Sequence, residues 1–229
     1  MLSKVKGGLI VSCQALPDEP LHSSFIMSRL ALAASQGGAV GIRANTPEDI
    51  EAIKETVDLP IVGIVKRDYQ DSNVYITPTK KEILELLNSN PDMIAMDATF
   101  EKRPNGESLA SIMEYMKTYH PNVQTMADIA TREQAIEAEK LGFDCVSTTL
   151  RGYTQETQGL RNDDNNFEFV RQLVELLSIP VIAEGNIDTP EKAAKCLQYG
   201  CHAVVVGGAI TRPKQITDKF VKAMVSTKV

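Results

Sequence analysis

Short apolar segments alternate with longer amphipathic segments along almost the whole chain, and this alternation limits the fold more than any other feature. Such alternation is typical of βα units, whose strands pair in parallel. Eight strands are predicted, over residues 8–13, 39–43, 61–65, 93–96, 123–127, 144–147, 181–183 and 203–206. Helices are predicted between them, among others over residues 25–35, 80–88, 109–119, 132–141 and 167–177.

Residues with special backbone preferences support these boundaries. Thr-Pro pairs at 46–47 and 189–190 place a hydroxyl at the N-cap and a proline at the first helical position, so each predicts a helix start. Glycines at 37–38, 142 and 200 precede strands and predict left-handed helix ends. The α/β class therefore rests on several independent signals.

Eight βα units fit either a closed barrel or an open doubly wound sheet. No glycine-rich dinucleotide motif follows the first strand, and a chain of 229 residues suits one barrel. We therefore expect a single-domain (β/α)₈ TIM barrel over residues 1–229. Segments 66–78 and 150–166 are too long for tight turns, so they are candidate lids.

Composition and charge limit the classes of ligand that the chain could bind. A net charge of −6 and a pI near 5.2 argue against nucleic acid or an anionic membrane as the ligand. No signal peptide or membrane-spanning segment is recognisable, so we expect a cytoplasmic protein. The four cysteines have no metal-site spacing and lie in or beside apolar runs, which predicts buried free thiols.

Polar residues gather just after the predicted strands, where barrel enzymes build their sites. The opposite ends carry mostly proline and glycine. The residues after the strands are Gln14, Arg43, Lys66, Arg67, Asp97, Asp128, Thr148, Thr149, Arg151, Glu184, Gly207, Gly208 and Arg212. So many ionisable groups at one face predict a functional site.

The segments after the last two strands predict a phosphate site. Glycines let backbone N–H groups approach an anion, a short helix can begin at Gly208, and Arg212 can donate to phosphate oxygens. Gly185 and Asn186 follow the seventh strand, and Gly207 and Gly208 follow the eighth.

Lys66 is the candidate proton-transfer group. His22, His120 and His202 lie beside helices or at the wrong strand end, and no metal-ligand spacing is present, so neither a histidine base nor a metal is expected. Arg67 and Arg43 should lower the pKa of Lys66, and burial should help. Asp128 and Glu184 remain as partner carboxylates.

Six strings stand at or just after the predicted strands: GGLIVSCQ from Gly7, GIR from Gly41, GIVKRD from Gly63, TTLRGYT from Thr148, VIAEG from Val181 and GGAITR from Gly207. Through these strings the chain resembles the bacterial N-acetylmannosamine-6-phosphate 2-epimerases from the first strand to the last. Two positions depart from the family pattern, Asn186 and Glu101, where basic residues are expected.

The resemblance implies conversion of N-acetylmannosamine 6-phosphate to N-acetylglucosamine 6-phosphate in sialic acid catabolism, with no cofactor. We expect a homodimer that binds a phosphosugar. The resemblance assigns catalysis to Lys66 and Glu184. The implied substrate contacts are Gln14, Arg43, Asp128 and Arg212. From their positions after the strands, we add Thr149 and Tyr153 as candidate substrate contacts, and Gly185, Asn186, Gly207, Gly208 and Arg212 as candidate phosphate contacts.

The implied reaction removes the C2 proton of the open-chain sugar and returns a proton to the other face. Lys66 and Glu184 would share this task, and Arg43 with Gln14 would stabilise the oxyanion. Two rivals stay open: a Schiff-base aldolase acting on a phosphosugar, and a phosphosugar-binding regulator without catalysis.

Overall fold

Eight parallel strands close into a barrel in which each strand pairs with its neighbours in chain order, β1 to β8, and β8 pairs with β1. The computed structural model describes residues 1–226. The strands are β1 (Leu9–Cys13), β2 (Gly41–Asn45), β3 (Ile61–Ile64), β4 (Met93–Asp97), β5 (Gln124–Asp128), β6 (Cys145–Ser147), β7 (Val181–Glu184) and β8 (Ala203–Val206). The predicted TIM barrel is confirmed.

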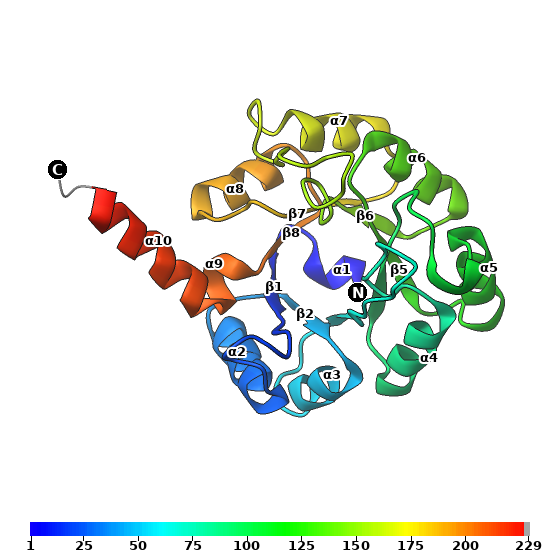
Figure 1. Cartoon of the computed structure of the whole chain (residues 1–229), viewed down its shortest axis with the longest axis horizontal. Helices are drawn as coiled ribbons and strands as arrows, with labels where there is room; N and C mark the ends of the chain where they lie inside the picture. Colours follow the sequence, from blue (N-terminus) through cyan, green and yellow to red (C-terminus); the bar gives the residue numbers. More distant parts are fainter. Residues whose placement is uncertain (227–229) are drawn as a thin grey trace.

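Helices surround the barrel as an outer ring (Figure 1). The helices of this ring are α2 (Ser24–Gln36), α3 (Pro47–Lys54), α4 (Lys80–Ser89), α5 (Leu109–Tyr119), α6 (Arg132–Leu141), α7 (Glu168–Leu176) and α8 (Pro190–Gln198). The other helices of the described residues are α1 (Leu2–Val5), α9 (Gly208–Thr211) and α10 (Pro213–Ser226), with a 3₁₀ turn at Pro104–Gly106. The predicted spans 109–119 and 132–141 agree with α5 and α6 residue for residue.

The predicted helix boundaries have clear physical causes. The hydroxyls of Thr46 and Thr189 accept hydrogen bonds from the backbone N–H groups of Asp49 and Lys192, which starts α3 and α8. Gly142 ends α6 in the left-handed region with φ of 77°. The prediction was wrong for Gly37, which is right-handed at φ −78°; the left-handed residue is Gly38 at φ 93°.

The second strand lies two residues later than predicted. Residues 39–43 were expected, whereas β2 runs to Asn45, which is paired with Ile64 of β3. Asn45 looks like a loop residue in the sequence. Its side-chain oxygen accepts a hydrogen bond from the backbone N–H of Lys66 at 2.8 Å, so this polar side chain is satisfied within the barrel wall.

Side-chain alternation along the strands separates two cores. Inward side chains such as Ile10, Val62 and Met126 fill the barrel, and outward ones pack beneath the helices. Helix α1, which the sequence did not predict, lies at the centre of the ring in Figure 1. Its Val5 belongs to the inner core, so α1 closes the N-terminal mouth of the barrel.

Helix α10 leaves the barrel instead of covering it. In Figure 1 it points away from the ring, beyond α9 and past the gap between α2 and α8. None of its described residues is buried, and Phe220, Val221 and Val225 are exposed. An outer groove of about 450 Å³ lies beside its origin, lined mainly by apolar residues that include Leu9, Leu197 and Ile210.

Candidate active site

A cleft of about 500 Å³ opens at the C-terminal ends of the strands. Eleven of the twelve predicted site residues line it: Gln14, Arg43, Lys66, Thr149, Tyr153, Glu184, Gly185, Asn186, Gly207, Gly208 and Arg212. Residues from six strands or strand ends therefore converge as predicted. Asp128 is the exception, because it is fully buried beneath Arg43 and does not line the cleft.

The period of two along each strand explains this convergence. Arg43 lies two residues after Gly41 on β2, and Lys66 lies two residues after Ile64, so both side chains continue an inward-facing series. Glu184 follows the inward Ile182 in the same way. Polar residues placed at the last inward position of each strand must meet at the barrel mouth.

Arg43 is held beneath the cleft by two carboxylates. Its Nη1 and Nη2 donate to Oδ1 and Oδ2 of Asp128 at 3.0 and 2.6 Å, and Nη1 also donates to Oε2 of Glu184 at 2.9 Å. The Arg43 side chain is 1% exposed and Asp128 is 0% exposed, so one buried cation faces two carboxylates. A buried guanidinium is stable only while carboxylates compensate its charge and accept its hydrogen bonds.

This arrangement favours the protonated form of Glu184. Burial raises the pKa of Glu184 above its ordinary value, and repulsion by Asp128 adds to this while Arg43 opposes it. Its Oε2 receives the hydrogen bonds from Arg43 and from Thr149, the latter at 3.0 Å. Within residues 1–226, Oε1 has no hydrogen-bond partner, so this oxygen is available to a ligand.

Thr149 joins the two carboxylates. Its Oγ1 lies 2.7 Å from Oδ1 of Asp128 and 3.0 Å from Oε2 of Glu184. A hydroxyl has one proton, so Thr149 donates to one carboxylate at a time. Thr149 was predicted as a substrate contact, and in this structure its hydroxyl is engaged in the carboxylate network.

The environment of Lys66 lowers the pKa of its amine. Burial lowers the pKa of Lys66 to about 8, and the charges of Arg43 and Arg212 contribute. No hydrogen bond or ion pair involving its ammonium group is present among residues 1–226. At pH 7 a pKa of about 8 leaves roughly a tenth of the amine neutral, and this fraction rises with pH.

The predicted role of Arg67 in lowering this pKa was wrong. Arg67 points to α4, where it pairs with Glu82 and, at 2.9 Å, with Glu85. The second cation that acts on Lys66 is Arg212, from the far side of the barrel. Sequence proximity suggested Arg67, but consecutive residues project to opposite sides of an extended backbone.

Arg212 lines the cleft beside the predicted short helix α9, at the end where the sequence predicts a phosphate site. Its Nε and Nη2 donate to the two carboxylate oxygens of Glu19, at 2.7 and 3.2 Å. Asn186 adopts φ of 59° beside Gly185 at φ 97°. A side chain at Gly185 would also crowd the buried amide of Asn162, which explains glycine at this position.

The two predicted lid segments both reach the cleft. Segment 66–78 contributes Tyr75 and Ile76, and segment 150–166 contributes Tyr153 and Arg161. The first segment is fixed at its base, because Thr77 Oγ1 donates to the carbonyl of Ala95 at 2.7 Å. Tyr75 was missed in the sequence; the only signal for it was its position within a candidate lid.

Three other predicted features lie outside the cleft. Asp97 is buried, and its Oδ1 accepts hydrogen bonds from Thr99. Arg151 packs over the ring of Phe169, with 3.9 Å between the guanidinium carbon and the ring centroid. Glu101 is reached by the side-chain amide of Asn73 at 3.4 Å and does not line the cleft.

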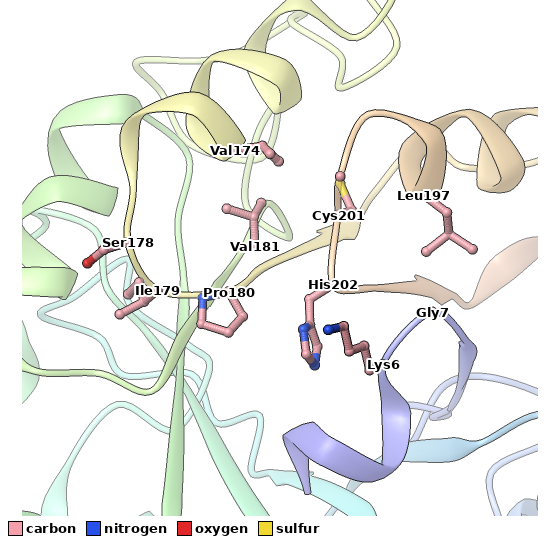
Figure 2. A pocket seen from close by; sticks show the side chains of 11 residues that line it. Lys6, Gly7, Val174, Ser178, Ile179, Pro180, Val181, Leu197, Cys201 and His202 are labelled. Carbon is pink, nitrogen blue, oxygen red and sulfur yellow. The ribbon is translucent and has the colours of Figure 1, made fainter.

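The opposite end of the barrel has a hollow of a different kind (Figure 2). This space of about 420 Å³ is lined by Lys6, Cys201, His202 and mostly apolar residues. His202 is engaged there with the carbonyl of Leu2 at 2.8 Å. Among the described residues that line it, only Lys6, Cys201 and His202 have ionisable side chains, whereas the cleft at the other end gathers arginine, lysine and carboxylate groups.

Metal and membrane features were searched over the part of the chain that the structure describes. Within residues 1–226 no group of three or more His, Cys, Asp or Glu side chains could hold a metal ion. The helices in this range are too short or too polar to cross a bilayer. All four cysteines are buried and free, as predicted.

Comparison with known proteins agrees with this geometry. Residues 27–226 match the family model described as "NanE: Putative N-acetylmannosamine-6-phosphate epimerase". A relative from Enterobacter sp. strain 638, named as an N-acetylmannosamine-6-phosphate 2-epimerase of this kind, is 61% identical over 98% of this chain and 95% of its own length. A relative of the same name from Oceanobacillus iheyensis is 62% identical over 96% of this chain and all of its own length.

A solved structure extends the match to three dimensions. The N-acetylmannosamine-6-phosphate 2-epimerase from Clostridium perfringens superposes with a TM-score of 0.93 at 56% identity, covering 97% of this chain and 96% of that one. Sequence and structure agree over almost the full length of each chain. The chain therefore belongs to the N-acetylmannosamine-6-phosphate 2-epimerase family.

Proposed function

We propose that this enzyme interconverts N-acetylmannosamine 6-phosphate and N-acetylglucosamine 6-phosphate by moving a proton at C2, with Lys66 and Glu184 as the two proton carriers. The observation that supports it is the presence in one cleft of a lysine of lowered pKa, without a side-chain partner among residues 1–226, and a largely buried carboxyl of raised pKa. Groups shifted toward neutrality are suited to proton transfer near pH 7.

The aldehyde of the open-chain sugar acidifies the proton at C2. The neutral amine of Lys66 accepts this proton, and the C2–H electron pair moves into an enolate whose charge lies on the C1 oxygen. The Oε1 of Glu184, when protonated, delivers a proton to the opposite face of C2. No ion pair joins Lys66 to Glu184, although each affects the pKa of the other, which leaves room for a carbon atom between them.

Arg43 and Gln14 are placed to stabilise the enolate oxygen. Both line the cleft, and the Nε of Arg43 is buried without a hydrogen-bond partner within residues 1–226. Asp128 contributes through Arg43, because its carboxylate fixes the guanidinium by two hydrogen bonds and has no surface in the cleft. We therefore assign Asp128 a positioning role.

The experiment that tests this proposal is turnover in deuterated water. The expected product has solvent deuterium at C2, detected by NMR, because the proton removed exchanges or is replaced from the other face. Product without label at C2 would favour a hydride or bond-cleavage route, unless one shielded group returned the same proton. Borohydride trapping tests the aldolase alternative, since only a Schiff base would be fixed covalently to Lys66.

Arg212 is proposed to bind the 6-phosphate. Arg212→Ala should raise KM at least tenfold with a smaller effect on kcat, because charge-assisted hydrogen bonds contribute about 1.5–3 kcal/mol and the phosphate does not change during the reaction. Steady-state kinetics with N-acetylmannosamine 6-phosphate checks this. Equal turnover of the phosphorylated and unphosphorylated sugars by the wild-type enzyme would contradict the assignment.

A homodimer built by exchange of α10 is proposed as the assembly. The helix leaves the barrel with apolar residues exposed, Phe220 at 68%, and the adjacent groove beneath Ile210 presents apolar residues of β1, β8 and α8. In a (β/α)₈ barrel, the helix after the last strand usually covers the part of the barrel wall where this groove lies, at β8 and β1. A second copy supplies the matching helix, and the contact is then symmetric.

The assembly can be tested by multi-angle light scattering after gel filtration. Wild-type protein should have the mass of a dimer, and Phe220→Asp together with Val221→Asp should shift it to monomer by placing charge in an apolar contact. Lys222→Ala, an exposed position on the same helix, should leave the dimer intact. A wild-type monomer at micromolar concentration would contradict the proposal.

A further inference from the structure

One carboxylate bound to a cleft residue has no role in the proposed chemistry. Glu19 lies on the segment between β1 and α2 and is 25% exposed on its side chain. It pairs with Arg212 through two hydrogen bonds, 2.7 Å from Nε and 3.2 Å from Nη2. The Glu19 carboxylate and a phosphate are both anions and would both bind Arg212. The presence of Glu19 at a proposed phosphate-binding arginine therefore needs an explanation.

The geometry of the pair gives that explanation. A guanidinium has five N–H donors and two edges that can bind an oxyanion in a bidentate manner. Glu19 occupies the edge formed by Nε and Nη2. Both protons of Nη1 and the second proton of Nη2 are left, and no residue within 1–226 accepts from Nη1. The free edge can therefore bind phosphate while Glu19 stays in place.

Glu19 is itself held in position. Its Oε2 accepts a hydrogen bond from the backbone N–H of Leu16 at 2.8 Å, and its own backbone N–H donates to the carbonyl of Leu16 at 2.9 Å. This turn follows directly after Gln14, which lines the cleft. The carboxylate is thus fixed to the barrel through β1, and it fixes the long, flexible side chain of Arg212 in turn.

We propose that Glu19 is a positioning residue for phosphate recognition, which holds Arg212 by one edge and presents the other edge to the substrate. This inference rests on the proposed phosphate role of Arg212. The opposite arrangement, in which Glu19 competes with phosphate for Arg212, would require the ion pair to break on each binding event. Pre-orientation lowers the entropy cost of binding, whereas competition would weaken it.

Kinetics of five variants test the proposal, with N-acetylmannosamine 6-phosphate as substrate and inorganic phosphate as competing ligand. Glu19→Ala should raise KM and the inhibition constant of phosphate about tenfold each, the loss of one charge-assisted contact, while kcat stays within about twofold. Glu19→Gln, which keeps one acceptor oxygen for Nε, should lose less. Asp18→Ala, the neighbouring exposed acid, should match wild type.

The double variant separates positioning from general damage. If Glu19 acts only through Arg212, Glu19→Ala with Arg212→Ala should have the KM of Arg212→Ala alone. A lower KM in Glu19→Ala would show competition, and fully additive effects would show independent action; either overturns the inference. If Arg212→Ala itself left KM unchanged, the phosphate assignment would fall instead. Thermal unfolding of Glu19→Gln confirms that the variant is folded.

Discussion

Lys66→Ala is expected to abolish epimerisation and the exchange with solvent of the C2 proton that faces Lys66, while the phosphosugar still binds. The pKa of this amine, about 8, makes a neutral base accessible near physiological pH. Loss of a general base typically lowers the rate by about 10²–10⁴. Turnover in deuterated water measures both reactions, and calorimetry with the substrate measures binding.

Lys66→Arg is the matched variant that separates charge from proton transfer. Arginine keeps the positive charge beside Glu184 but does not give up its proton in proteins. If Lys66 transfers protons, the arginine variant should be as inactive as the alanine variant. Substantial activity in Lys66→Arg would show an electrostatic role, and near-normal turnover in Lys66→Ala would move the base to a carboxylate.

Much of the site could be predicted because the fold imposes a simple rule. Strand ends meet at one mouth, so Gln14, Lys66 and Glu184 were found from their positions after apolar runs. The alternation of side chains also fixes which strand-end residues point inward. Neither inference needs knowledge of tertiary packing beyond the closure of the barrel.

The contacts that define each residue's role could not be predicted in the same way. Asp128 and Arg43 are 85 residues apart, and only the structure shows that Asp128 is sealed beneath Arg43. Glu19 and Arg212 are 193 residues apart. Arg67 follows Lys66 directly yet points to α4. Spatial neighbours across a barrel leave no periodic signal in the sequence, whereas strands and helices do.

The direction of α10 also could not be predicted from the sequence. Its amphipathic pattern predicts a helix, and the barrel fold predicts that this helix covers β8. The structure instead directs it away from the ring. An apolar face on a helix specifies that something covers it, but the pattern is the same whether the covering surface belongs to the same chain or to a second copy.

Glu184→Gln should remove epimerisation while leaving the fold intact. Because the pKa of Glu184 is raised, its ionised form is disfavoured in the folded state, so a neutral isosteric amide should not lower the free energy of unfolding. Asp128→Asn provides the contrast. Removing the charge that compensates buried Arg43 should cost about 3–5 kcal/mol, measured as a lower midpoint of denaturant unfolding.

The position of the solvent label then distinguishes two proton carriers from one. In Glu184→Gln, Lys66 should still exchange the C2 proton of the epimer whose proton faces it, without forming product, and the other epimer should show no exchange. Adding Lys66→Ala should make turnover little worse than either single change, since groups that act as a unit are not additive. Epimerisation at a near-normal rate, or exchange into both epimers, would mean that Glu184 does not serve the second face and that Lys66 reaches both.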